Sequence, residues 1–160
     1  MGIVIAVDPS IVSAGFAVFK NNVLVDTLLI KPKTLNRKLE IVLKLNGLFC
    51  KVFSGYSGEE ITLAIETQYI ALKNSAVLKT SEVKGIVEGA FLNWFNSGKI
   101  LEVSPTEAKK AMGMIHRLKR KESKKFILDA VQKIYPQIAS QDIADSVAIG
   151  ICAIKKTLQS

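Results

Sequence analysis

Two short apolar runs, each ending in an acidic residue, constrain the fold of this chain more than any other feature. Residues 2–8 form one run, which ends in Asp8, and residues 61–66 form the other, which ends in Glu66. Apolar character that is continuous rather than alternating is typical of strands that are buried on both faces of a sheet. The sequence therefore predicts a sheet covered by helices on both sides, with a carboxylate at the end of each of two central strands.

The other segments complete an α/β pattern. We expect further strands at 14–20, 23–31 and 99–104, and helices at 35–53, 76–96, 121–134 and from 140 onward, with a short helix starting at Ser104. Asn21-Asn22 predicts a tight turn, so the first three strands should form an antiparallel meander, and the later strands should run parallel to the first. The predicted fold class is α/β, a mixed five-stranded sheet flanked by helices. No repeat or linker interrupts it, so we expect one domain over residues 1–160.

The helix that starts near Ser140 carries a second pair of acids. Asp142 and Asp145 are three residues apart, so they lie side by side on the helix, where like charges repel each other. A solvated first turn would explain this pair alone, because the helix dipole favours acids there. Ligands of α/β sheets bind beyond the carboxyl ends of the strands. If the helix docks at that end, its two acids join Asp8 and Glu66.

A cluster of these four acids would need a counterion. Neighbouring carboxylates raise one another's pKa values unless a cation offsets their charge. Hard divalent cations such as Mg²⁺ or Mn²⁺ prefer oxygen ligands and would stabilise the cluster. Two such ions about 4 Å apart can activate a water molecule and stabilise the leaving oxygen of a phosphodiester. We therefore expect Mg²⁺ as the cofactor, with Mn²⁺ able to substitute and two ions in the site.

Basic residues are concentrated in one part of the chain. The formal net charge is +8, from 22 basic and 14 acidic residues, and 8 of the 22 lie within residues 109–125. They are Lys109, Lys110, Arg117, Lys119, Arg120, Lys121, Lys124 and Lys125. Such a surface favours binding of a polyanion such as DNA, although a merely solvated face is the alternative.

Nothing in the sequence predicts a membrane protein. No segment approaches the ~18 uninterrupted apolar residues of a membrane-spanning helix, and residues 1–7 lack the basic leader of an export signal, so we expect a cytoplasmic location. Cys50 and Cys152 have no partner at zinc-binding spacing, so we expect both to be free and mostly buried thiols.

Three stretches together carry a resemblance to a known family. They read Ile5-Ala-Val-Asp-Pro-Ser10, Ala64-Ile-Glu-Thr-Gln-Tyr69 and Asp142-Ile-Ala-Asp-Ser-Val-Ala-Ile-Gly-Ile-Cys152. In residue identity and spacing they resemble the RuvC-type Holliday-junction resolvases of the ribonuclease H-like nuclease superfamily, over nearly the whole chain. The resemblance implies a ribonuclease H-like fold, a homodimer, and Mg²⁺-dependent paired nicking of four-way DNA junctions in recombination and repair. It does not say which motor protein, if any, is a partner.

The resemblance also assigns roles to residues. Asp8, Glu66, Asp142 and Asp145 match the family's catalytic, metal-binding acids. Tyr69 falls where the family carries an aromatic residue that meets bases near the junction centre. With the basic run, the DNA contacts that we expect are Tyr69, Lys73, Asn74, Lys84, Lys109, Arg117, Lys119, Arg120 and Lys121. Lys121 matches a basic DNA contact of the family, although Lys119 fits the same place.

The chain departs from the family pattern at three places. Ser10 replaces a usual glycine, Ser81-Glu82 replaces glycine-glutamine, and residues 114–119 replace a glycine-rich loop. These departures are typical of a divergent, phage-type member with broader specificity for branched DNA.

The apolar side of helix 76–96 exceeds what one core needs, which predicts a dimer seam there, with burial in a single core as the alternative. Its residues are Val77, Val83, Ile86, Val87, Ala90, Phe91 and Trp94. Three other functions compete with a junction nuclease. They are a flap nuclease, a non-catalytic nucleic-acid-binding module of the same fold, and a phosphotransferase of the actin and sugar-kinase type, for which 160 residues are too few.

Overall fold

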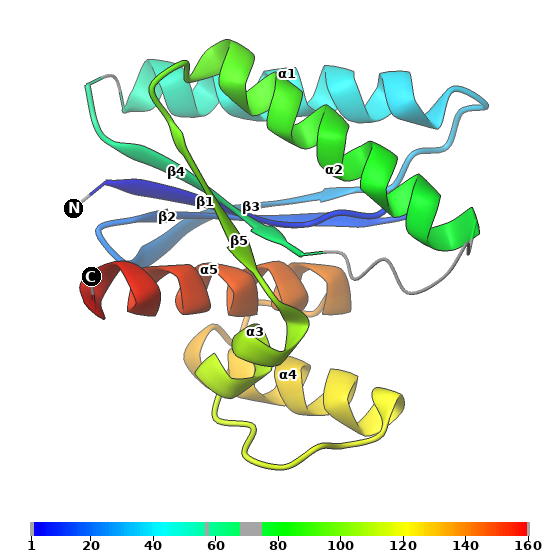
Figure 1. The fold of residues 1–160 in the computed structure, drawn as a ribbon, viewed down its shortest axis with the longest axis vertical. Coiled ribbons are helices and arrows are strands. Elements are labelled where there is room, and N and C mark those ends of the chain that lie inside the picture. The colour runs from blue at the N-terminus through cyan, green and yellow to red at the C-terminus, as the bar shows by residue number, and fades with distance from the viewer. Residues whose placement is uncertain (1, 57, 68–74, 160) are drawn as a thin grey trace.

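The computed structural model describes residues 2–56, 58–67 and 75–159 (Figure 1). Its elements, in chain order, are β1 (Ile3–Asp8), β2 (Ala14–Lys20), β3 (Val23–Ile30), α1 (Arg37–Gly55), β4 (Ile61–Glu66), α2 (Ser75–Trp94), β5 (Lys99–Val103), α3 (Pro105–Ala111), α4 (Arg120–Ile134) and α5 (Gln141–Gln159). The type of every element agrees with the sequence prediction, and most boundaries agree within two residues. No helix among the described residues is long and apolar enough to cross a membrane.

The strands form one mixed sheet in the order β3-β2-β1-β4-β5. β1 is antiparallel to β2 and parallel to β4, and β4 is parallel to β5. Asn21 and Asn22 both have positive φ angles, of 49° and 68°, as a tight hairpin turn requires. The predicted meander and the predicted parallel strands are therefore both confirmed.

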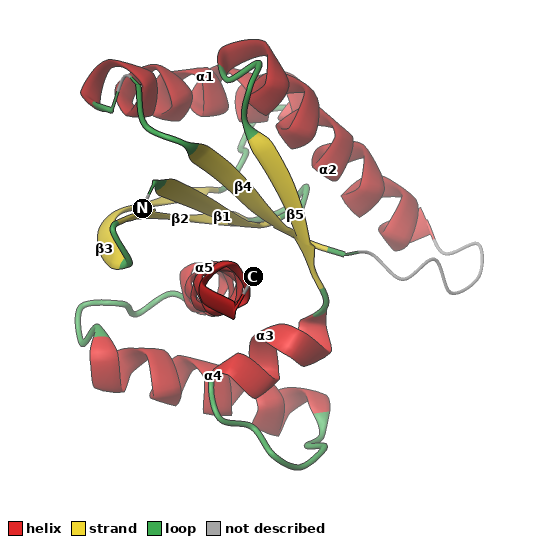
Figure 2. Ribbon diagram, turned by 60° about the vertical axis from the view of Figure 1, so that its left-hand side comes forward, coloured by secondary structure: helices red, strands yellow, loops and turns green. Residues whose placement is uncertain are grey.

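Helices cover both faces of the sheet, in one layer on one face and in two layers on the other. α1 and α2 pack on one face, whereas α5 lies across the other and is covered in turn by α3 and α4 (Figures 1 and 2). Because α5 lies between the sheet and these two helices, it is buried on nearly all sides, including Ser146 and Gly150. The apolar strands β1, β2 and β4 contribute side chains to the core on both faces.

Two glycines allow α5 to approach the sheet closely. A Cβ atom on Gly15 in β2 would lie 2.0 Å from the carbonyl oxygen of Asp142, and one on Gly150 would lie 2.3 Å from the ring of Phe19. Neither position has room for a side chain. The first contact fixes the start of α5 against the start of β2, next to the end of β1.

The structure differs from two predictions of the sequence, for Cys50 and for the apolar side of α2. Cys50 is exposed, so the prediction that it is a buried thiol is wrong, whereas Cys152 is buried as expected; both are free. On α2, the residues taken for a dimer seam belong largely to the core of one chain. Val83, Val87 and Phe91 are fully buried because α2 packs against α1 and the sheet.

Candidate active site

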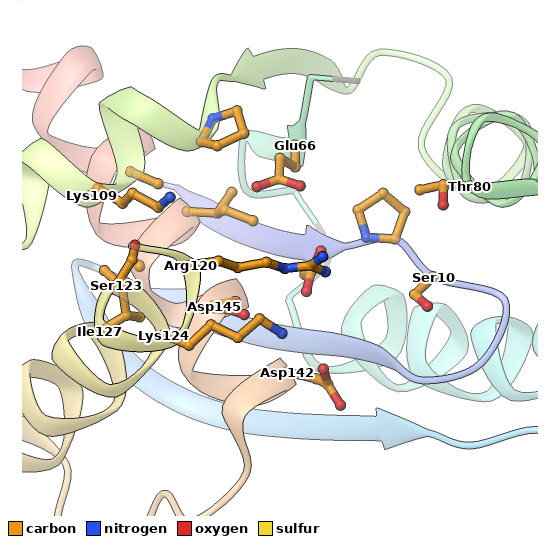
Figure 3. Close-up of a pocket in the computed structure, with 16 residues that line it drawn as sticks. Ser10, Glu66, Thr80, Lys109, Arg120, Ser123, Lys124, Ile127, Asp142 and Asp145 are labelled. Carbon is orange, nitrogen blue, oxygen red and sulfur yellow. The ribbon is translucent and has the colours of Figure 1, made fainter. Parts of the chain in front are cut away.

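A pocket of about 350 Å³ lies at the carboxyl ends of β1 and β4, and all four predicted acids line it (Figure 3). Asp8 ends β1 and Glu66 ends β4, while Asp142 and Asp145 lie in the first turns of α5. These residues come from three segments far apart in the sequence. The structure therefore brings them to one edge of the sheet, as the sequence predicted.

The pairing of the strands explains why the first two acids are neighbours. β1 and β4 run parallel, with Val7 opposite Ile65, so the next residue of each strand reaches the same edge. In each strand the three residues before the last are buried, which leaves the terminal carboxylate at the boundary between core and pocket. The close contact of Gly15 with the backbone of Asp142 brings α5 to the same place.

Two hydrogen bonds hold the carboxylates of α5. The Ser13 hydroxyl donates to Asp142 Oδ2 at 2.5 Å, and the Gln141 side-chain amide donates to Asp145 Oδ1 at 2.8 Å. Neither donor was predicted as a site residue. Gln141 had a sequence signal, because it lies four residues before Asp145 and so on the same side of the predicted helix.

Three acids of the pocket, Asp8, Glu66 and Asp145, have raised pKa values. Burial raises the pKa of Asp8 well above its usual value, and the charges of Glu66, Asp145 and Asp142 raise it further. Burial also raises the pKa of Glu66 to about 7, with a further contribution from Asp145. The pKa of Asp145 is raised by burial too. Close, partly buried carboxylates that share one site behave in this way.

Cationic side chains at the rim oppose this effect. Lys109 of α3 and Arg120 and Lys124 of α4 line the pocket, and Figure 3 shows the two α4 side chains extending into it between Glu66 and Asp142. The charge of Lys124 lowers the pKa values of Asp8, Glu66 and Asp145. Lys124 belongs to the basic run but was not among the predicted DNA contacts, because only the docking of α4 brings it to the acids.

The other predicted DNA contacts have varied positions. Arg117 lines a second cavity that adjoins the pocket, whereas Lys119 and Lys121 line neither. The Lys84 ammonium is bound to the Glu102 carboxylate and lies 3.6 Å from that of Glu88, and it does not line the pocket. The predictions for Tyr69, Lys73 and Asn74 lie outside the described residues.

The donor set fits a hard divalent cation. Its ligands would all be carboxylate oxygens, which suit Mg²⁺ or Mn²⁺. Burial, and then the charges of neighbouring acids, raise the pKa values of Asp8 and Glu66, and a bound cation would offset both effects. As they stand, no three His, Cys, Asp or Glu side chains in the described parts of the chain are arranged to hold a metal ion. The pocket therefore has the chemistry of a metal site without a preformed coordination shell.

Comparisons with known proteins bear on the family and the fold. Residues 4–153 match the model of the family described as crossover junction endodeoxyribonuclease RuvC. No match was found among curated protein sequences.

Solved structures of similar fold include those of Holliday junction resolvases. That of T. thermophilus RuvC in complex with a Holliday junction substrate has a TM-score of 0.75 at 18% identity, and covers 100% of this chain and 97% of that chain. A Thermus thermophilus RuvC structure has a TM-score of 0.71 at 20% identity, and covers 98% of this chain and 96% of that chain. The yeast mitochondrial Holliday junction resolvase Ydc2 has a TM-score of 0.56 at 12% identity, with coverage of 98% and 79%.

At these identities the structures show a shared fold, the ribonuclease H-like mixed sheet with its flanking helices. The family match covers nearly the whole sequence, including Asp8, Glu66, Asp142 and Asp145. The chain therefore belongs to the crossover junction endodeoxyribonuclease RuvC family.

Proposed function

We propose that this crossover junction endodeoxyribonuclease cuts DNA at the pocket of Asp8, Glu66, Asp142 and Asp145, with two Mg²⁺ ions, or Mn²⁺ in their place, held by these carboxylates. The observation that carries the proposal is the meeting of four acids from three distant segments in one pocket with a cationic rim. The substrate is a four-way DNA junction. The T. thermophilus structure, which has the same fold, holds a Holliday junction substrate and supports this choice.

One set of residues would bind the metal, and another would bind the DNA. A bound divalent cation supplies Lewis acidity, which activates water and stabilises the leaving oxygen of a phosphodiester. Asp142 and Asp145 are already oriented by Ser13 and Gln141, so these two carboxylates lose little freedom on binding an ion. Lys109, Arg120 and Lys124 at the rim would hold the DNA phosphates and reduce their repulsion from the acids.

Paired cutting of a junction needs two sites, and we propose a homodimer through the outer face of α2. The exposed residues Leu78, Glu82, Gly85, Gly89 and Leu92 follow one another at helical spacing along that face. Leu78 is 63% exposed and Leu92 is 47% exposed. A Cβ atom on either glycine would have nothing within 4 Å. Small residues between two leucines would let a second copy of the helix approach closely.

A cleavage assay with a neutral variant of one acid tests the site. Wild-type protein is expected to cut a labelled four-way junction with Mg²⁺ and not in EDTA. Asp142→Asn is expected to keep junction affinity within about threefold but to lower the cleavage rate by about 100-fold or more, because even outer-shell partners of a metal matter by up to that factor. Parallel flap, duplex and single-strand substrates define the selectivity.

Asp129→Asn is the matched control, because Asp129 is an exposed acid of α4 that does not line the pocket. It should cut at the wild-type rate. Wild-type rates from the Asp142 variant would refute the assigned site. Binding of junctions by the wild type with no metal-dependent cutting would instead favour a non-catalytic module, and preference for flaps would favour the flap nuclease.

A further inference from the structure

A second cavity, of about 650 Å³, adjoins the catalytic pocket. It lies between the end of α3, the segment 113–119 and the start of α4, and it shares Lys109, Arg120 and Ser123 with the pocket. A DNA strand whose phosphate lies at the four acids would therefore reach this cavity without crossing another element.

The segment that forms the cavity is fixed at both ends. At its start, Gly113 has a φ of 90°, and the amides of Gly113 and Met114 donate to the carbonyls of Lys110 and Lys109 at 2.9 and 3.0 Å. Met114 is buried there. At its end, the amide of Lys119 donates to the carboxylate of Glu122 at 3.0 Å, which caps α4. The residues between these anchors are thus presented in one place rather than on a free loop.

Those central residues combine an apolar side chain with positive charge. Ile115 is 87% exposed and Leu118 is 38% exposed. Lys109, Lys110, Arg117 and Arg120 line the same cavity, and among the described residues that line it there is no carboxylate. An isoleucine held out into water has no role in the core, and a cationic surround excludes a basic partner. DNA offers both phosphates for the cations and apolar base faces for the isoleucine.

We propose that Ile115 is a base-contacting residue, which packs against an unstacked base next to the crossover while Arg117 and its neighbours hold the adjoining phosphates. This inference rests on the proposed function and deepens it. Apolar side chains inserted at a base step unstack it, and this costs least where stacking is already interrupted, as at a branch point. Ile115 would then favour branched DNA over linear duplex, whereas the cations act on both alike.

A fluorescent base tests this directly. In EDTA, so that no strand is cut, 2-aminopurine is placed in turn at each position beside the crossover of a four-way junction, and protein is added. Wild type is expected to raise the fluorescence at one position, because the base there loses its stacking. Ile115→Ser should abolish that rise and weaken junction binding by about tenfold, while linear duplex binding changes by less than about twofold.

Val23→Ser is the matched control. Val23 is 60% exposed and lies opposite Lys20, at the far end of the sheet from Asp8, so this variant should behave as wild type. Arg117→Gln should weaken junction and duplex binding alike and reduce the salt slope of binding by about one. If Ile115→Ser behaves as either of these variants does, the segment is only a charged rim and the inference is overturned. A wild type that cuts no junction in Mg²⁺ would refute the proposed function separately, because the fluorescence is read without cutting.

Discussion

Asp8 is the residue at which the proposed metal binding and the stability of the fold oppose each other most directly. Burial and three neighbouring acids raise its pKa well above the unfolded value, so the folded state binds a proton there more tightly than the unfolded chain does. Stability is therefore lost as the pH rises from the unfolded pKa through the folded one. Without a cation, ionisation of the Asp8 carboxyl group therefore destabilises the fold.

Removal of this charge should therefore stabilise the protein in the absence of metal. Asp8→Asn is expected to raise the melting temperature in EDTA by about 3 °C or more, which corresponds to about 1 kcal/mol for a chain of this size. Mg²⁺ should raise the melting temperature of the wild type and have a much smaller effect on the variant, because a ligand is missing. Scanning fluorimetry with and without Mg²⁺ measures both shifts. Equal Mg²⁺ shifts in the two proteins would show that Asp8 is not a ligand.

At the scale of the elements, α2 shows what helical periodicity can and cannot predict. The sequence located the helix, but its apolar side was assigned to a seam, whereas Val83, Val87 and Phe91 fill the core between α2, α1 and the sheet. Periodicity identifies the side of a helix that is covered but not the partner that covers it. The exposed Gly85 and Gly89 carry no apolar signal, so this face became visible only once the packing of α2 was known.

The strands were predictable for the opposite reason. β1 and β4 are continuous apolar runs that end in acids, and parallel pairing brings the ends of such strands together. The sequence alone did not say that α5 docks at that edge; the resemblance to the family did. The hydrogen bond of Ser13 joins side chains 129 residues apart, and the position of Lys124 depends on how α4 packs on α5, so local patterns encode neither. The bond from Gln141 to Asp145 spans only four residues of α5, so helical spacing could have predicted it.

Substitution of the two exposed glycines of α2 separates the seam from the fold. The double variant Gly85→Gln and Gly89→Gln should be at least as stable as the wild type within each chain, because glycine costs about 1 kcal/mol in a helix interior and neither Cβ meets a neighbour. It should nevertheless sediment as a monomer and nick one junction strand at a time. Gly47→Gln on α1, another exposed helical glycine with open space around it, should leave the dimer intact. A dimeric double variant would place the seam elsewhere.

At the scale of the whole molecule, the proposed active site combines acidic residues of the sheet and α5 with a basic residue of α4. The acids come from the sheet and α5, whereas Lys124 comes from α4. Lys124 lines the pocket because α4 packs on α5. The charges of Lys109 and Lys124 lower the pKa of Glu66, which burial nevertheless raises to about 7. Metal ligands must be deprotonated, so Mg²⁺ binding should strengthen as the pH rises through neutrality.

Lys124→Gln should shift that dependence. Without the ammonium, the pKa values of Asp8, Glu66 and Asp145 rise, so the carboxylates keep their protons to higher pH and the midpoint for Mg²⁺ binding moves upward by about half a pH unit. Calorimetric titration of Mg²⁺ between pH 5.5 and 9 would measure it without DNA. Lys125→Gln removes the same charge one residue along α4, outside the pocket lining, and should leave the midpoint unchanged. Equal midpoints in the two variants would mean that net charge, rather than the position of α4, sets the acidity of the site.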